Sequence, residues 1–210
     1  MRIATRLDMD THTYVKADHS IRFQFTGVAE GNISVDSHSP IQLTGNVYNP
    51  SGTTNILTDA DFTASGASSI TSGITRIRAN GDIGSADNSL AIATNELSLQ
   101  SDNGSLSFNA TAMGSALAID QLSAKYGILG TADKSIVAKD ANTLISANTI
   151  DLTSLSGSIG SLGTLGDPAS YNYLNIASTG AVSLRAANDI VVSQATGDLQ
   201  VERIEANNNV

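Results

Sequence analysis

Cysteine and tryptophan are absent from this chain of 210 residues, and aromatic residues make up only 4% of it. Without cysteine, the chain has neither a disulfide framework nor a thiolate metal site. The scarcity of aromatic rings leaves few platforms on which a sugar could stack. A cysteine-free chain is also compatible with export, because an exported protein crosses membranes unfolded.

Basic residues are few as well, with 11 Lys and Arg against 20 Asp and Glu and a net charge of −9. They are scattered along the chain, so there is no electrostatic footprint for a phosphate backbone. No apolar run approaches the roughly 20 residues that span a bilayer, and the N-terminal segment lacks the apolar centre of a signal peptide. The sequence therefore predicts neither a nucleic-acid partner nor a membrane span.

What the chain does contain is a series of apolar pairs, in which one residue separates the two apolar residues. Small or polar residues isolate each pair, and a hydrophobic fraction of 40% is enough for a folded core. A period of two is typical of short strands with one buried face. The pairs are Leu97 and Leu99, Leu106 and Phe108, Leu117 and Ile119, Ile150 and Leu152, Leu174 and Ile176, Val182 and Leu184, Ile190 and Val192, and Leu199 and Val201.

A glycine motif recurs along the chain. It occurs as GNISVDSHSPIQL from residue 31, GDIGSADNSLAIA from 81, GILGTADKSIVAK from 127 and GSIGSLGTLGDP from 157. The approaches ITRIRANGDIGS and IDLTSLSGSIGS also match each other. The intervals fit multiples of a coil of roughly 20 to 27 residues. We expect the motif glycines to permit a positive φ or a close backbone approach at corners of the coil; they are Gly81, Gly84, Gly127, Gly130, Gly157 and Gly160.

These patterns predict an all-β protein, a parallel β-helix (β-solenoid) with short strands, on the order of eight coils spaced about 4.8 Å apart. Residues 31–206 form the solenoid and residues 207–210 a polar tail. Residues 1–30, with the segment TYVKADHSIRFQF, are interpreted as a hairpin or a longer capping strand rather than a coil. Two roles stay open for this segment: it covers the open end of the solenoid, or it pairs with a neighbouring subunit.

The motifs GDIGS and GSIGS, together with VYNPSGTTNIL from Val47 and AANDIVVSQATGDLQVERI from Ala186, resemble a known family. They are similar to the repeat region of filamentous-haemagglutinin-type large exoproteins, adhesins exported by two-partner secretion, over roughly residues 31–206. The resemblance implies a right-handed β-helix in a surface or secreted fibre, often adhesive. The secretion domain of that family carries Asn-Pro-Asn-type motifs, to which only NPSG at Asn49 to Gly52 comes close.

The segment DPASYNYL holds the best candidates for an exposed ligand-contact loop, namely Asp167, Tyr171 and Tyr173. The alternative is a turn insertion that packs its tyrosines on the flank of the solenoid. Adhesion to a host or matrix glycan or protein, if present, is expected on such a loop. Other expected partners are neighbouring solenoid segments or copies of the same chain, and the expected location is extracellular, at the bacterial cell surface.

No catalytic, cofactor or metal site is predicted. His12, His19 and His38 lack the third or fourth ligand that zinc requires, and are interpreted as surface residues. Recurrent aspartates are expected to cap turns rather than to bind calcium; they are Asp82, Asp87, Asp102, Asp133, Asp189 and Asp198. The rival hypotheses are a polysaccharide-processing β-helix enzyme, which needs clustered titratable groups that no single repeat contains, and a self-assembling filament subunit joined by strand pairing.

Overall fold

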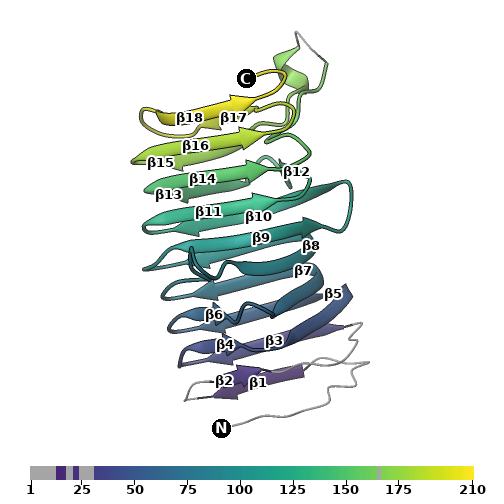
Figure 1. Ribbon diagram of the computed structural model, residues 1–210, viewed down its shortest axis with the longest axis vertical. Coiled ribbons are helices and arrows are strands. Elements are labelled where there is room, and N and C mark those ends of the chain that lie inside the picture. The colour runs from purple at the N-terminus through teal and green to yellow at the C-terminus, as the bar shows by residue number, and fades with distance from the viewer. Residues whose placement is uncertain (1–12, 18–20, 24–30, 165–166) are drawn as a thin grey trace.

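The structure, a computed structural model, describes residues 13–17, 21–23, 31–164 and 167–210. The described chain consists of strands, turns and one short 3₁₀ helix, η1 (Pro168–Ser170). Figure 1 shows the strands stacked as rungs, with β1 (Thr13–Ala17) and β18 (Gln200–Ala206) at opposite ends of the stack. The chain makes about 8 turns, and its paired strands are parallel. This is the predicted all-β parallel β-helix.

One sheet receives a strand from successive turns of the chain, and we call it face 1. Its neighbouring strands pair in the order of the turns. Besides β1, face 1 contains β3 (Asn32–Ser37), β5 (Asn46–Thr58), β7 (Ser69–Ala79), β8 (Leu90–Ser101), β10 (Ala116–Ala124), β13 (Leu144–Ala147), β15 (Leu174–Ser178) and β17 (Val192–Gln194).

Further strands complete each turn. The first three of them form a separate sheet, β2 (Ile21–Phe23), β4 (Ile41–Leu43) and β6 (Phe62–Ala64). Single bridges through Ile83 connect that sheet to the later strands. These are β9 (Leu106–Ala112), β11 (Gly127–Ala132), β14 (Thr149–Ser154), β16 (Ala181–Ala186) and β18, while β12 (Ser135–Ala138) pairs with β10.

The register sets the length of a coil. Ile33 pairs with Thr54, and Thr54 pairs with Thr75, so equivalent positions are 21 residues apart in this part of the chain. This value lies within the predicted range. Between Ile145 and Ile176 the separation grows to 31 residues, because a loop that contains η1 is inserted there. The insertion follows the last copy of the glycine motif, so it lengthens this coil but does not account for the irregular intervals between the earlier copies.

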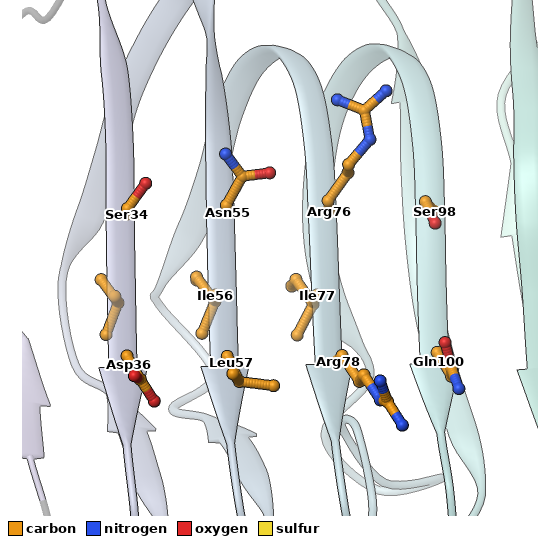
Figure 2. Close-up of a pocket in the computed structure, with 11 residues that line it drawn as sticks. Ser34, Asp36, Asn55, Ile56, Leu57, Arg76, Ile77, Arg78, Ser98 and Gln100 are labelled. Atoms are coloured by element: carbon orange, nitrogen blue, oxygen red, sulfur yellow. The ribbon is translucent and has the colours of Figure 1, made fainter. Parts of the chain in front are cut away.

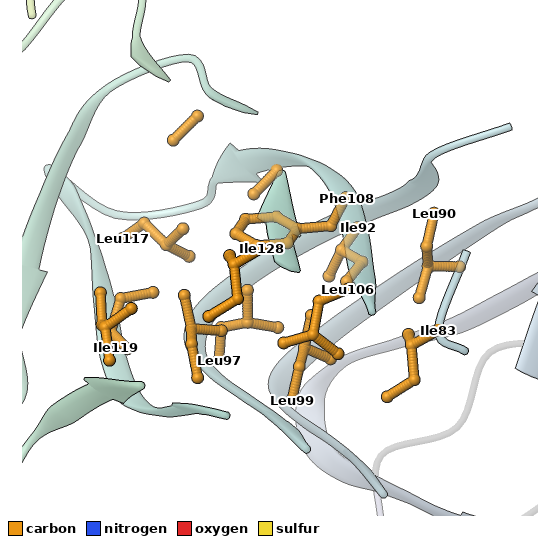
Figure 3. Close-up of a cluster of buried hydrophobic side chains, with 14 of the residues drawn as sticks. Ile83, Leu90, Ile92, Leu97, Leu99, Leu106, Phe108, Leu117, Ile119 and Ile128 are labelled. Atoms are coloured by element: carbon orange, nitrogen blue, oxygen red, sulfur yellow. The ribbon is translucent and has the colours of Figure 1, made fainter. Parts of the chain in front are cut away.

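The core lies inside the coils, where apolar side chains of one turn stack on those of the next. Figure 3 shows this packing around Leu97 and Leu99 of β8 and Phe108 of β9, all of which are buried. Burial of such side chains contributes about 1.5–3 kcal/mol each, so the stacked core is the main source of stability. The first six predicted pairs are buried, but in the seventh Val192 is only partly buried and Val191 is buried beside Ile190. The last pair differs, because Val201 is 53% exposed and the register between β16 and β18 shifts beside its partner Val182.

Many strands end in a small residue whose side chain is buried, and the sequence patterns did not predict the role of this residue. Ser101 ends β8, and its Oγ donates to the Gly81 carbonyl at 2.7 Å and accepts from the Gly104 amide at 2.9 Å. Ser154 at the end of β14 repeats the arrangement with the Gly157 amide at 3.2 Å. The hydroxyl thereby satisfies backbone groups at a corner where no strand pairing is available.

The glycine motif has two structural meanings. In GDIGS and GSIGS, Gly84 (φ 67°) and Gly160 (φ 75°) adopt the left-handed conformation, and each amide donates to the preceding coil. These two copies are equivalent corners, as predicted. The GILG copy is different, because Gly127 and Gly130 lie within β11 and pair in register with β14. The alignment of this copy with a corner is therefore wrong; a Cβ on Gly130 would meet Phe108 Cζ at 2.4 Å, so its close approach is to a core side chain.

In the N-terminal segment, the described strands β1 and β2 pair with the strands of the next coil and not with each other. Thr13 of β1 pairs with Ile33, and Ile21 of β2 pairs with Ile41, in both cases in parallel. A hairpin would instead pair β1 with β2 in antiparallel fashion, so the described strands agree with the alternative of a strand that stacks on the end of the solenoid. At the other end, the tail continues the stack, since the Asn209 carbonyl accepts from the Ile190 amide at 2.9 Å.

Candidate functional site

The predicted contact loop is a small excursion from the solenoid. Reciprocal backbone hydrogen bonds of 2.9 and 2.8 Å between Ser161 and Asn172 close it, and η1 projects beyond the sheets in Figure 1. The Tyr171 and Tyr173 rings lie 5.8 Å apart at 53°, and Tyr173 is 37% exposed. Asp167 accepts from the Ala169 amide at 3.2 Å. The tyrosines therefore contact each other, while the aspartate stabilises its own turn.

The histidine and aspartate candidates form no metal centre in the described part of the chain, where no group of three or more potential ligands converges. His38 contacts the Asp59 carboxylate through Nδ1, and His12 and His19 lie outside the described residues. Both His38 and Asp59 are about half exposed. This pair agrees with the interpretation of His38 as a surface residue.

Several of the predicted turn aspartates link neighbouring coils rather than capping their own turns. Asp82 accepts from the Ser105 amide at 2.7 Å, and Asp133 accepts from the Ala112 amide at 2.7 Å. Asp189 accepts from the Asn209 amide at 3.2 Å. The acceptor and donor residues are 20 to 23 positions apart, about one coil. Asp102 instead receives the Arg78 guanidinium, whereas Asp87 and Asp198 are exposed.

Two sets of ionisable groups converge in the described part of the chain: Glu205 contacts Arg185 and Arg203 at 3.2 and 2.8 Å, and a larger set, which we call the charged quartet, joins two cations to two carboxylates. Arg76 contacts Glu96 at 2.6 Å and Asp120 at 3.6 Å, while Lys139 contacts the same two carboxylates at 2.9 and 3.4 Å. The four residues come from β7, β8, β10 and the segment after β12. The Glu96 side chain is only 16% exposed, so this carboxylate is the centre of the quartet.

Each charge in the quartet is neutralised by its neighbours. The hydrogen bond to Glu96 raises the pKa of Lys139 above its usual value, although partial burial opposes this effect. Adjacent carboxylates can act as acid and base on a sugar, but here each of them already contacts both cations. The arrangement holds coils together, because Lys139 and Glu96 are 43 residues apart.

The quartet was not predicted from the sequence, because its four members lie in different coils and no single repeat contains a cluster of ionisable residues. No local motif surrounds Arg76, Glu96, Asp120 or Lys139, but their positions in the sequence follow one another at intervals of about one coil. Charged residues of opposite sign that recur at the length of one coil are therefore the sequence signal for such a cluster.

Face 1 carries a shallow hollow of about 400 Å³ on its outer surface, which we call the face 1 hollow. Figure 2 shows outward side chains in two rows that cross the strands, one through Asn55 and Arg76 and the other through Leu57 and Arg78. The hollow spans β3, β5, β7 and β8, and is lined by Ser34, Val35, Asp36, Asn55, Ile56, Leu57, Arg76, Ile77, Arg78, Ser98 and Gln100.

Comparison with known proteins adds no relative to these observations. Among the described residues, no helix has the length and apolar character needed to cross a membrane. No protein-family model, no curated protein and no solved structure matches the chain.

Proposed function

We propose that this chain is a structural and adhesive segment of an extracellular bacterial fibre. The observation that supports the proposal is the uninterrupted core of stacked turns, from Ile33 in β3 to Leu184 in β16. A solenoid in which each turn packs on its neighbours resists bending, and turns spaced about 4.8 Å apart give a rod roughly 40 Å long. Reach and stiffness are the properties that such a fibre needs.

The surface supports the same role. The chain is acidic and free of cysteine, as suits an exported protein, and its motifs resemble those of haemagglutinin-type exoproteins. In this proposal the chain has no catalytic role, and the charged quartet links neighbouring coils through ion pairs on the outer surface. Contacts with a host or matrix partner take place on the outer faces and on the Ser161–Tyr173 excursion.

Surface labelling of the producing bacterium tests the proposal. Antibodies against the purified chain are applied to intact cells, to permeabilised cells and to a strain that lacks the gene. We expect labelling of intact cells or recovery of the protein from the culture medium, and none in the deletion strain. Labelling that requires permeabilisation would place the protein inside the cell and would overturn the proposal.

A polysaccharide-processing enzyme is the second candidate, because Glu96 and Asp120 lie together beside two cations. A panel of soluble polysaccharides incubated with the purified chain tests it through the release of reducing ends or unsaturated products. Product formation that disappears in Glu96→Gln would establish this activity and remove the non-catalytic role. We expect no release.

Self-assembly is the third candidate, since β1 and β2 are the end strands of their sheets within the described residues. Removal of residues 1–30 separates the alternatives. A strand that only covers the end leaves a monomeric, somewhat less stable protein in sizing experiments. A strand that joins subunits instead leaves a chain that no longer assembles.

A further inference from the structure

The outer side of face 1 differs in charge from the rest of the molecule. The whole chain has a net charge of −9, whereas the outward positions of face 1 from β3 to β15 carry three acidic residues, Asp36, Glu96 and Asp120, and two arginines, and Lys139 contacts two of these carboxylates. The remaining positions carry mostly amides, hydroxyls and aliphatic groups; they are Ser34, Asn55, Leu57, Ser98, Gln100, Gln121, Ser123, Leu144, Ser146, Asn175 and Ala177. This face is therefore nearly neutral and rich in hydrogen-bonding groups.

The two arginines of the face 1 hollow are held in place by neighbouring carboxylates. Arg76 donates to Glu96 at 2.6 Å, and Arg78 donates to Asp102 through Nε at 3.1 Å and Nη2 at 3.0 Å. Each guanidinium has five N–H donors, so donors remain for a ligand while the charge is compensated. Fixed donors of this kind lose little conformational entropy when a ligand binds.

On the strands on either side of the arginines lie groups suited to an uncharged partner. Leu57 is 41% exposed and gives the hollow an apolar surface. Within the described residues, the structure records no hydrogen bond for the Asn55 amide or for the Ser34 and Ser98 hydroxyls, all of which line the hollow. An apolar surface with a few polar groups in fixed positions is the usual composition of a small-molecule site.

We propose that the face 1 hollow binds a linear, uncharged glycan that lies along the solenoid axis and crosses the strands. A pyranose ring presents apolar C–H faces to Leu57 and hydroxyl groups to the amide, hydroxyl and guanidinium rows. Within each row the side chains follow one another at the strand spacing of about 4.8 Å, so successive sugar units meet one side chain of each strand in turn. The net charge of the chain repels polyanionic glycans, and an extended peptide would add to a sheet edge rather than to its face. The inference rests on the adhesive part of the proposed function.

Calorimetric titration of the full chain with cellohexaose tests the inference. The same titration with a heparin-derived hexasaccharide tests whether the chain binds an anionic glycan instead. The double variant Asn55→Ala/Leu57→Ala removes one polar and one apolar contact at outward positions. The matched control, Asn109→Ala/Thr131→Ala, changes outward residues that pair with each other on β9 and β11. Circular dichroism melting verifies that both variants are folded.

We expect saturable binding of cellohexaose that weakens about tenfold or more in the Asn55→Ala/Leu57→Ala variant, and that stays within about twofold in the control. Should the double variant fail to fold, Ser98→Tyr fills the hollow from β8 and must abolish binding by itself. No binding of cellohexaose at millimolar concentration, equal losses in variant and control, or binding of the heparin fragment alone would overturn the inference. Surface labelling of cells is independent of these outcomes, so a failure here leaves the structural role of the fibre intact.

Discussion

Gly84 offers a sharp test of how the corners are built, because another glycine with the same backbone conformation serves as its control. Gly84 has φ 67° and Gly197 has φ 70°. A Cβ on Gly84 would lie 2.3 Å from the Ser107 carbonyl oxygen, whereas a Cβ on Gly197 would meet nothing within 4 Å. Gly84→Ala and Gly197→Ala therefore share the conformational strain, and only the first adds an overlap with backbone.

The magnitudes differ accordingly. An alanine in the left-handed region costs about 1–2 kcal/mol, and Gly197→Ala should lose about 1 kcal/mol because the substitution also restricts the unfolded chain. In Gly84→Ala, the Ser107 carbonyl must move, although the amide of the same residue is bonded to the Ile83 carbonyl at 2.8 Å. Overpacking adds about 1–3 kcal/mol and a weakened backbone hydrogen bond about 1 kcal/mol. Gly84→Ala should therefore lose about 4 kcal/mol.

Urea unfolding followed by far-ultraviolet circular dichroism measures both free energies, with the slope of the transition as a check that the unfolded states are comparable. We expect the midpoint of Gly84→Ala to fall far below that of Gly197→Ala. If the two variants lie within about 0.5 kcal/mol of each other, close approach of adjacent coils does not explain the glycine at this corner, and the reasoning is refuted.

Three further outcomes are expected. Glu96→Gln removes the shared partner of two cations and should cost about 1 kcal/mol at low salt, with a smaller loss at high salt in thermal melts; a loss that is independent of salt contradicts the ionic role. Gly130→Ala should destabilise the fold through overlap with Phe108, and the added substitution Phe108→Leu should recover part of that loss, whereas additive losses in urea titrations would contradict direct contact. Partial desolvation raises the pKa of Asp151 above its usual value although the residue lies at the surface, so the folded state disfavours the ionised carboxyl; Asp151→Asn should stabilise the protein at pH 7, and pH-dependent melts should show that the gain vanishes below about pH 3.8.

Local patterns predicted the features that depend on neighbours in the sequence. Leu97 and Leu99 could be assigned to one buried face because side chains alternate along any strand, whatever the strand packs against. The corners at Gly84 and Gly160 were also predicted, because both follow an apolar residue and precede serine in the same local context. The segment around Asp167 was predicted as an exposed loop or a turn insertion with two tyrosines, and the structure places an excursion there.

Other features depend on which coil lies next to which, and these were missed or misjudged. The letters GILG resemble a corner, but Gly130 lies in a strand because its neighbours in β9 and β14 pair with it in register. The N-terminal segment looked like a hairpin, since its partner strand β3 lies about 20 residues away in the sequence. Strand partners are chosen by non-local packing, which a local pattern does not specify.

The sequence by itself determined that this chain forms strands with one buried face, because the period of two and the intervening turn residues are local properties of the chain; some strands, such as β5 with 13 residues, are longer than the sequence predicts. The tertiary structure decided what the surface can do. The length of each coil places Arg76 beside Glu96 and sets Asn55 and Leu57 in rows along face 1, and these contacts arise only when turns about 21 residues apart are stacked in register. Contacts between residues of different coils can therefore be identified in the tertiary structure but not from the order of residues along the chain.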